Sequence, residues 1–204
     1  MKGLIALVAK SSYDKLERLY GDVSSWAIWK EPDERPKSNT SDMSVFDDEN
    51  LLDKLNDKYV FVGLNASSTH GKRRDGKYGS WLNFHSDYAY QQDYKLRYAL
   101  LGTKYWGGYI TDIIKKYPEV DSAKVKNYLK NNPDIVESNI NDFRNELRIL
   151  SHDKPVLIAM GGFAYEILDN YLSKEYKIVK IMHYSSQIGQ EEYRKQILNI
   201  LDKI

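Results

Sequence analysis

The chain contains no cysteine, and this absence removes several kinds of chemistry at once. Disulfide scaffolds, thiol nucleophiles, cysteine-ligated zinc and iron–sulfur clusters are all excluded. A chain without cysteine also suits a reducing compartment, so we expect a cytoplasmic protein.

Strong net charge and long apolar runs are missing as well. The 30 basic and 29 acidic residues leave a net charge of +1, whereas nucleic-acid-binding domains are often strongly basic. The most basic stretch covers residues 70–77. The apolar stretch from Leu4 to Ala9 is too short to cross a bilayer and lacks a signal-peptide cleavage pattern. We therefore expect no membrane partner.

Several common catalytic motifs are also absent. There is no glycine-rich phosphate loop ending in Lys-Ser/Thr, no Gly-x-Ser-x-Gly elbow and no clustered set of metal ligands. The adjacent carboxylates Asp47, Asp48 and Glu49 lie in a polar segment, where a solvated helix start is the expected role. No metal and no cofactor are expected.

What is present fits one α/β domain spanning residues 1–204. Apolar residues make up 42% of the chain, enough for a core. Periodicity predicts strands at 59–64, 105–114, 155–160 and 176–182, and helices at 11–20, 47–56, 94–101, 121–130, 134–150, 162–172 and 188–203. Unbroken apolar strands alternating with helices predict a three-layer α/β/α fold around a mostly parallel four-stranded sheet. Residues 1–58 are expected to be a helical and loop extension packed on this domain, and the protein is expected to be a monomer.

Three segments place polar residues just past the carboxyl end of a predicted strand, which is where open α/β sheets bind ligands. They are Gly63-Leu64-Asn65-Ala66-Ser67, Gly161-Gly162 and His183-Tyr184-Ser185-Ser186. Together they offer an amide, exposed backbone N–H groups and an imidazole. Each also has a structural explanation: Asn65 can cap a turn, the two glycines can allow close packing of helix on strand, and His183 can bond a carbonyl.

Taken in order, these segments resemble the motifs of the uracil-DNA glycosylase superfamily. Its first motif has the form Gly-x-Asn/Asp/Glu-Pro-Gly, and residues 63–67 stand in its place here. Its last motif is His-Pro-Ser, matched at two of three positions by residues 183–185. Between them the family has a strand ending in Thr-Asn, represented here by Thr111-Asp112. It also has a strand of the Val-Ile-Ala-Leu-Gly type before a helix, represented by residues 156–164. The resemblance spans about residues 59–190.

The resemblance implies a DNA partner and a fold like that of this superfamily. It also implies hydrolysis of the N-glycosidic bond of a base flipped out of the helix. Asn65 would position the water and His183 would donate a hydrogen bond to the departing base. The base would be bound by Gly63, Leu64, Asp112 and an aromatic side chain that stacks on it, which is Phe84 or, failing that, Trp81. The implied phosphate contacts are Ser67, Gly161, Gly162, Ser185 and Ser186.

Departures from the family pattern bear on specificity. Ala66 and Tyr184 stand where the family has proline, and Asp112 stands where it usually has an asparagine that reads uracil. An ionised aspartate only accepts hydrogen bonds, so it would meet O4 of uracil without a donor, at a cost of about 1–3 kcal/mol. We therefore expect uracil to be a poor substrate, unless Asp112 points away and caps a helix.

Two other interpretations remain open at this point. One is a catalytically silent relative that binds nucleic acid or a protein partner, which the near-neutral charge and the three departures favour. The other is a hydrolase of free nucleosides or nucleotides. Salt-dependent binding to DNA would distinguish the glycosylase and the silent relative from the hydrolase of free nucleosides or nucleotides.

Overall fold

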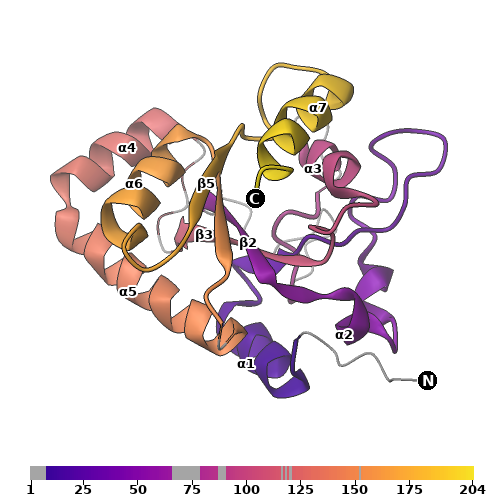
Figure 1. Ribbon diagram of the computed structural model, residues 1–204, viewed down its shortest axis with the longest axis horizontal. Coiled ribbons are helices and arrows are strands. Elements are labelled where there is room, and N and C mark those ends of the chain that lie inside the picture. The colour runs from indigo at the N-terminus through magenta and orange to yellow at the C-terminus, as the bar shows by residue number, and fades with distance from the viewer. Residues whose placement is uncertain are drawn as a thin grey trace.

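Figure 1 shows a computed structural model of the chain, which describes residues 8–65, 79–86, 91–115, 117, 119, 121–151 and 153–204. Ser67, the basic stretch 70–77 and most of the apolar stretch from Leu4 to Ala9 lie outside the described residues.

In the described part of the chain, one sheet of five strands runs in the order β1-β3-β2-β4-β5. The strands are β1 (Ser24–Trp26), β2 (Asn56–Asn65), β3 (Gly108–Ile114), β4 (Val156–Met160) and β5 (Ile178–Ile181). The pairs β2–β3, β2–β4 and β4–β5 are parallel, and β1 pairs antiparallel with β3. The sheet is therefore mostly parallel, as predicted, but it has five strands instead of four.

The additional strand, β1, comes from the segment expected to be a helical and loop extension. All three of its residues are buried, so it shows no alternation of apolar and polar side chains. Its pairing of Ser24 with Thr111 and of Trp26 with Tyr109 is what defines it as a strand. A run of three residues carries too little periodicity to be recognised, and only its partner β3 makes it visible.

Helices cover both faces of the sheet and give the three-layer architecture (Figure 1). One face carries α1 (Lys10–Tyr20), α4 (Ser122–Asn131), α5 (Pro133–Leu150) and α6 (Gly162–Leu172), and the other carries α3 (Asp93–Leu100) and α7 (Gln190–Leu201). The short elements η1 (Met43–Asp47) and α2 (Leu51–Lys54) precede β2.

Alternation along the central strands divides the core in two. Val60 and Val62 of β2 pack with the helices α1, α4, α5 and α6, whereas Phe61 between them packs with α3 and α7. In β4, Ala159 and Met160 face opposite sides in the same way. Successive side chains of a strand point to opposite faces, so these fully buried strands read as continuous apolar runs.

Candidate functional site

A cavity of about 540 Å³ opens at the carboxyl ends of the parallel strands. Its wall combines the ends of β2 and β4, one residue of β3, the segment after β5, and the segments that precede and begin α3. The residues that line it are Leu64, Asn65, Asn83, Phe84, Gln91, Gln92, Asp93, Asp112, Glu119, Ser122, Met160, Gly161, Gly162, Phe163, Ala164, His183, Tyr184 and Ser185.

The topology explains why the cavity forms at this place. The connection from β2 to β3 includes α3, which lies on one face of the sheet, and the connection from β3 to β4 includes α5 on the other face. Neighbouring strands β2 and β4 have connections that lead away from each other: β2 connects to β3 through α3 on one face, and β4 connects to β5 through α6 on the other. Open α/β sheets bind ligands at such a switch point.

Asn65, the last residue of β2, has its side-chain amide fixed in orientation. Its Nδ2 donates to the backbone carbonyls of Tyr117 (3.1 Å) and Glu119 (2.7 Å), which follow β3. These two bonds occupy both N–H groups and determine which end of the amide is oxygen. The site therefore presents Oδ1 of Asn65 as an acceptor of defined direction.

His183 lies on the same cavity wall, just after β5, and its tautomer is defined by its neighbours. The backbone N–H of Ser185 donates to Nδ1 at 3.1 Å, and the Ser185 hydroxyl is 2.8 Å from the same nitrogen. The neutral ring therefore carries its proton on Nε2. Burial lowers the pKa of His183 to about 4, so at neutral pH the imidazole is an uncharged donor.

Gly161 and Gly162 form the start of α6 at the cavity wall. Gly161 has φ = +100°, a conformation that favours glycine, and a Cβ built on it would lie 3.7 Å from Cβ of His183. The backbone conformation, and not a lack of space, is therefore what favours glycine at this position. The first backbone N–H groups of α6 have no partner within the helix and bring the positive end of its dipole to the cavity.

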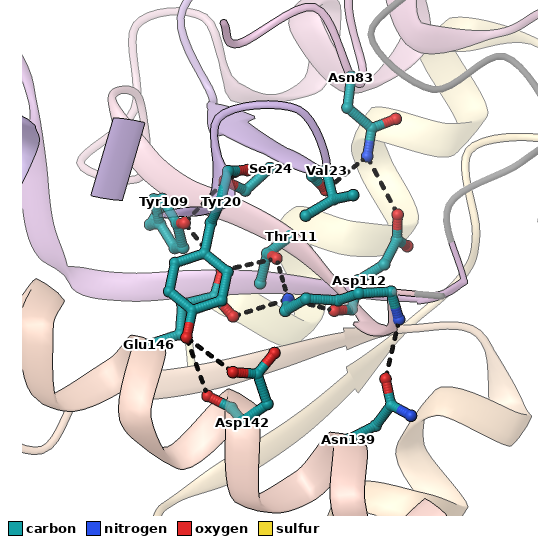
Figure 2. A network of polar contacts seen from close by, with 11 residues as sticks. Tyr20, Val23, Ser24, Asn83, Tyr109, Thr111, Asp112, Asn139, Asp142 and Glu146 are labelled. Carbon is teal, nitrogen blue, oxygen red and sulfur yellow. Dashed lines mark hydrogen bonds and ion pairs between the residues drawn. The ribbon is translucent and has the colours of Figure 1, made fainter. Parts of the chain in front are cut away.

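Asp112 of β3 is buried beside Gly63 of β2, its register partner. A Cβ on residue 63 would lie 2.1 Å from Oδ1 of Asp112, so the carboxyl occupies the space that only glycine leaves. The other oxygen, Oδ2, accepts a hydrogen bond from Nδ2 of Asn83 at 3.1 Å (Figure 2). Nδ2 of Asn83 also donates to the carbonyl of Val23 at 2.8 Å. Asp112 therefore points to the cavity and does not cap a helix.

The environment of Asp112 holds its proton more tightly than usual. Burial raises the pKa of Asp112 to about 7, against the lowering effects of the Asn83 hydrogen bond and the Lys115 charge, and Glu146 raises it further. Asp112 therefore keeps its proton to a higher pH than an exposed aspartate does, and its neutral form can donate a hydrogen bond as well as accept one.

A buried ion pair between Lys115 and Glu146 holds the backbone of Asp112 in place. Nζ of Lys115 is 2.7 Å from Oε2 of Glu146 and also donates to Oγ1 of Thr111 (2.9 Å) and to the backbone carbonyl of Asp112 (2.8 Å). Oε1 of Glu146 accepts from the hydroxyls of Tyr109 (2.8 Å) and Thr111 (2.9 Å), as Figure 2 shows. The network links β3 to α5 and fixes the backbone that presents Asp112.

A second buried carboxyl, Asp93 at the start of α3, lines the same cavity, and nothing in the sequence marked it. Its Oδ2 accepts from the backbone N–H of Ser86 at 2.8 Å. Burial raises the pKa of Asp93 to about 7, although the Ser86 bond and the adjacent Tyr184 hydroxyl lower it. Tyr184 itself stacks on His183, with ring centroids 4.3 Å apart.

The other expected site residues are divided between the cavity and the core. Phe84, Leu64 and Ser185 line the cavity. The expectation for Trp81 needs correction, because this side chain is buried away from the cavity: Nε1 donates to the Tyr13 hydroxyl at 2.8 Å, and its ring packs against Trp26.

Ser186 is also not part of the cavity wall. Its carbonyl accepts from Nζ of Lys95 at 2.8 Å, and its backbone N–H donates to the carbonyl of His183 at 3.0 Å. The peptide of Ser186 therefore shapes the turn after His183. Ser67 lies outside the described residues.

The described wall contains three carboxyl groups and neither lysine nor arginine. Among the residues that the structure describes, no group of three or more His, Asp or Glu side chains is arranged to hold a metal ion. In the same part of the chain, no helix combines the length and apolar character needed to cross a membrane.

Asn83 and Asp93 are the residues of the site that sequence reasoning missed. Asn83 lies in the segment searched for a stacking aromatic, and Asp93 looks like an ordinary acidic residue in the first turn of a helix. Asn83 is distinguished only by its hydrogen bond to Asp112, and Asp93 only by its burial at the cavity wall. Comparisons of the chain with protein-family models, with curated proteins and with solved structures found no match.

Proposed function

We propose that this protein is an N-glycosylase of the uracil-DNA glycosylase type, which hydrolyses the bond between a flipped base and its deoxyribose. The observation that carries the proposal is that Asn65 and His183, far apart in the sequence, line one cavity with Phe84 and Asp112. Such a reaction uses an oriented amide, a donor to the departing base and an aromatic ring that stacks on the base. Asp112 adds a hydrogen-bonding carboxyl where the family has an asparagine.

In the proposed reaction, a water attacks C1′ of the sugar while the C–N bond breaks and its electron pair leaves with the base. The sugar passes through an oxocarbenium-like state, the base departs as an anion, and the proton lost by the attacking water passes to the surrounding water. Oδ1 of Asn65 accepts a hydrogen bond from the water and orients it. An amide oxygen can accept two hydrogen bonds, so this contact is compatible with a neighbouring protein donor.

His183 stabilises the departing base by donating from Nε2–H. Because Ser185 holds Nδ1 as an acceptor, the donor is directed away from the Ser185 turn. A preorganised donor of this kind, aimed at developing negative charge, contributes about 2.7–4 kcal/mol to catalysis. The low pKa of His183 keeps the donor uncharged over the neutral range.

The proposal is tested by base release from single-stranded and duplex oligonucleotides carrying uracil, hypoxanthine, xanthine or alkylated bases. Asn65→Ala and His183→Ala are each expected to lower the release rate about 10²–10³-fold on the base that wild type removes. Gln187→Ala, an exposed neighbour in sequence, is the matched control and should retain activity. Release that survives both substitutions would refute the site assignment. Robust uracil release that Asp112→Asn leaves unchanged would refute the selectivity against uracil.

A catalytically silent relative is the second candidate, and the charge of the cavity favours it. The described wall has no cationic side chain to neutralise a phosphate or a departing anion. Such a relative would bind nucleic acid, with a salt-dependent affinity, or a protein partner, and it would release no base. Binding and turnover measured on the same oligonucleotides distinguish the two candidates.

A further inference from the structure

The two oxygens of Asp112 are not equivalent, and the difference comes from its neighbours. Oδ2 accepts the hydrogen bond from Asn83, whereas Oδ1 has no hydrogen-bond partner among the described residues and lies over Gly63. The residue is only 3% exposed and lines the cavity, so Oδ1 is the carboxyl oxygen that a ligand in the cavity can reach. A carboxyl oxygen without a protein partner can form a hydrogen bond with a ligand.

The bond from Asn83 also determines where an added proton must go. Nδ2 of Asn83 is committed as a donor to both Val23 and Asp112, so Oδ2 is an acceptor in either protonation state. A protonated Asp112 therefore carries its hydrogen on Oδ1. The same atom is an acceptor when the carboxyl is ionised and a donor when it is neutral.

We propose that Asn83 is a positioning residue that makes Oδ1 of Asp112 the single reading atom for the base. Ionised Asp112 accepts from an exocyclic amino group, and protonated Asp112 donates to an exocyclic carbonyl at the same place. This inference rests on the proposed function in taking the ligand to be a nucleobase. It adds that amino-bearing bases such as cytosine are bound preferentially above neutral pH and carbonyl-bearing bases such as uracil below it.

Most charged and titratable groups around Asp112 keep the same charge over the neutral pH range, so a change in binding across this range can be traced to Asp112. Lys115 of β3 and Glu146 of α5 are paired at 2.7 Å and largely compensate each other. Across the cavity, Tyr184 is neutral because burial and the nearby Asp93 and Asp112 raise its pKa well above the usual range, and His183 is also neutral. Asp93 has a pKa of about 7, so its protonation must be followed with that of Asp112.

The test uses the full-length protein and two free bases, uracil and cytosine, which differ in whether position 4 carries a carbonyl or an amino group. Dissociation constants are measured by calorimetry at about pH 5.5 and about pH 8.5, on either side of the Asp112 pKa of about 7. The ratio of uracil affinity to cytosine affinity should fall at least about tenfold between the two pH values, because one hydrogen bond to a buried partner is exchanged for a repulsion.

Three variants identify the responsible groups. Asp112→Asn removes the titration at this position, so the affinity ratio should become independent of pH, whereas Asp93→Asn should leave the pH dependence in place. Asn83→Ala removes a bond that lowers the Asp112 pKa, so the midpoint of the change should move to higher pH. A merely structural role for Asn83 would alter stability and leave this midpoint where it is.

A flat affinity ratio in wild type, an unchanged slope in Asp112→Asn, or no binding of either base would overturn the inference. These results differ from a failure of the proposed function. If the free bases show the pH-dependent preference but no oligonucleotide loses a base, the glycosylase proposal fails and the reading atom stands. If bases are released from DNA but the free bases show no pH-dependent preference, the inference about Oδ1 of Asp112 fails and the glycosylase proposal stands.

Discussion

The buried ion pair beneath the cavity allows a quantitative test of how the site is supported. Lys115→Met leaves Glu146 as an uncompensated buried carboxylate, and Glu146→Gln leaves Lys115 as an uncompensated buried ammonium. Both side chains are at most 5% exposed, and removing one partner of such a pair costs about 3–5 kcal/mol. Each single variant should therefore lose this amount of unfolding free energy, measured by urea denaturation.

For the double-mutant cycle, the double variant Lys115→Met with Glu146→Leu should be less destabilised than Lys115→Met alone or Glu146→Leu alone. It removes both charges, and the Tyr109 hydroxyl keeps the Ser24 oxygen at 2.8 Å as a neighbour. Replacing a whole buried pair by apolar residues is often neutral or stabilising, so a coupling energy of several kcal/mol is expected from the double-mutant cycle.

The same variants should shift the Asp112 pKa in opposite directions, which a loss of stability alone does not predict. Lys115 lowers this pKa and Glu146 raises it. Carbon-13 NMR titration of the Asp112 carboxyl should therefore give a value above about 7 in Lys115→Met and below about 7 in Glu146→Gln. Shifts of the same sign, or single-variant costs that simply add in the double variant, would refute the reasoning.

Two further predictions concern the contact between β2 and β3. Gly63→Ala places a Cβ 2.1 Å from Oδ1 of Asp112, so it should lower the unfolding free energy by about 1–3 kcal/mol. Gly162→Ala is the control: nothing lies within 4 Å of its Cβ, so its unfolding free energy should stay within about 0.5 kcal/mol of wild type. Equal effects in urea denaturation would contradict this. Asp112→Asn should raise the unfolding free energy at about pH 8. The folded pKa of about 7 exceeds the ordinary 3.8, so the folded state binds the extra proton, and stability falls as pH rises through this window. The gain in unfolding free energy should reach at most about 4 kcal/mol and vanish near pH 4. The control Asp153→Asn, at an exposed position, should show no such pH-dependent gain. A gain that does not depend on pH would argue against a buried, titrating carboxyl.

The sequence by itself determined the order and type of the main elements. Residues 59–64 and 155–160 are unbroken apolar runs bounded by polar segments, and helix α5 has one apolar face, so local periodicity was enough to recognise them. Because parallel strands end at a common edge, the same pattern also placed Asn65, the two glycines and His183 near one another.

Only the tertiary structure decided the fifth strand, the positions of Trp81 and Ser186, and the parts played by Asn83 and Asp93. Each depends on a partner that is distant in the chain: β1 on β3, Trp81 on Tyr13, and Asn83 on Asp112. The protonation of Asp112 is likewise a property of burial, because the same carboxyl in water would be ionised at neutral pH. Local periodicity indicates which side chains are buried in the core. Desolvation and hydrogen bonding across the sheet depend on neighbours that only the folded chain brings together.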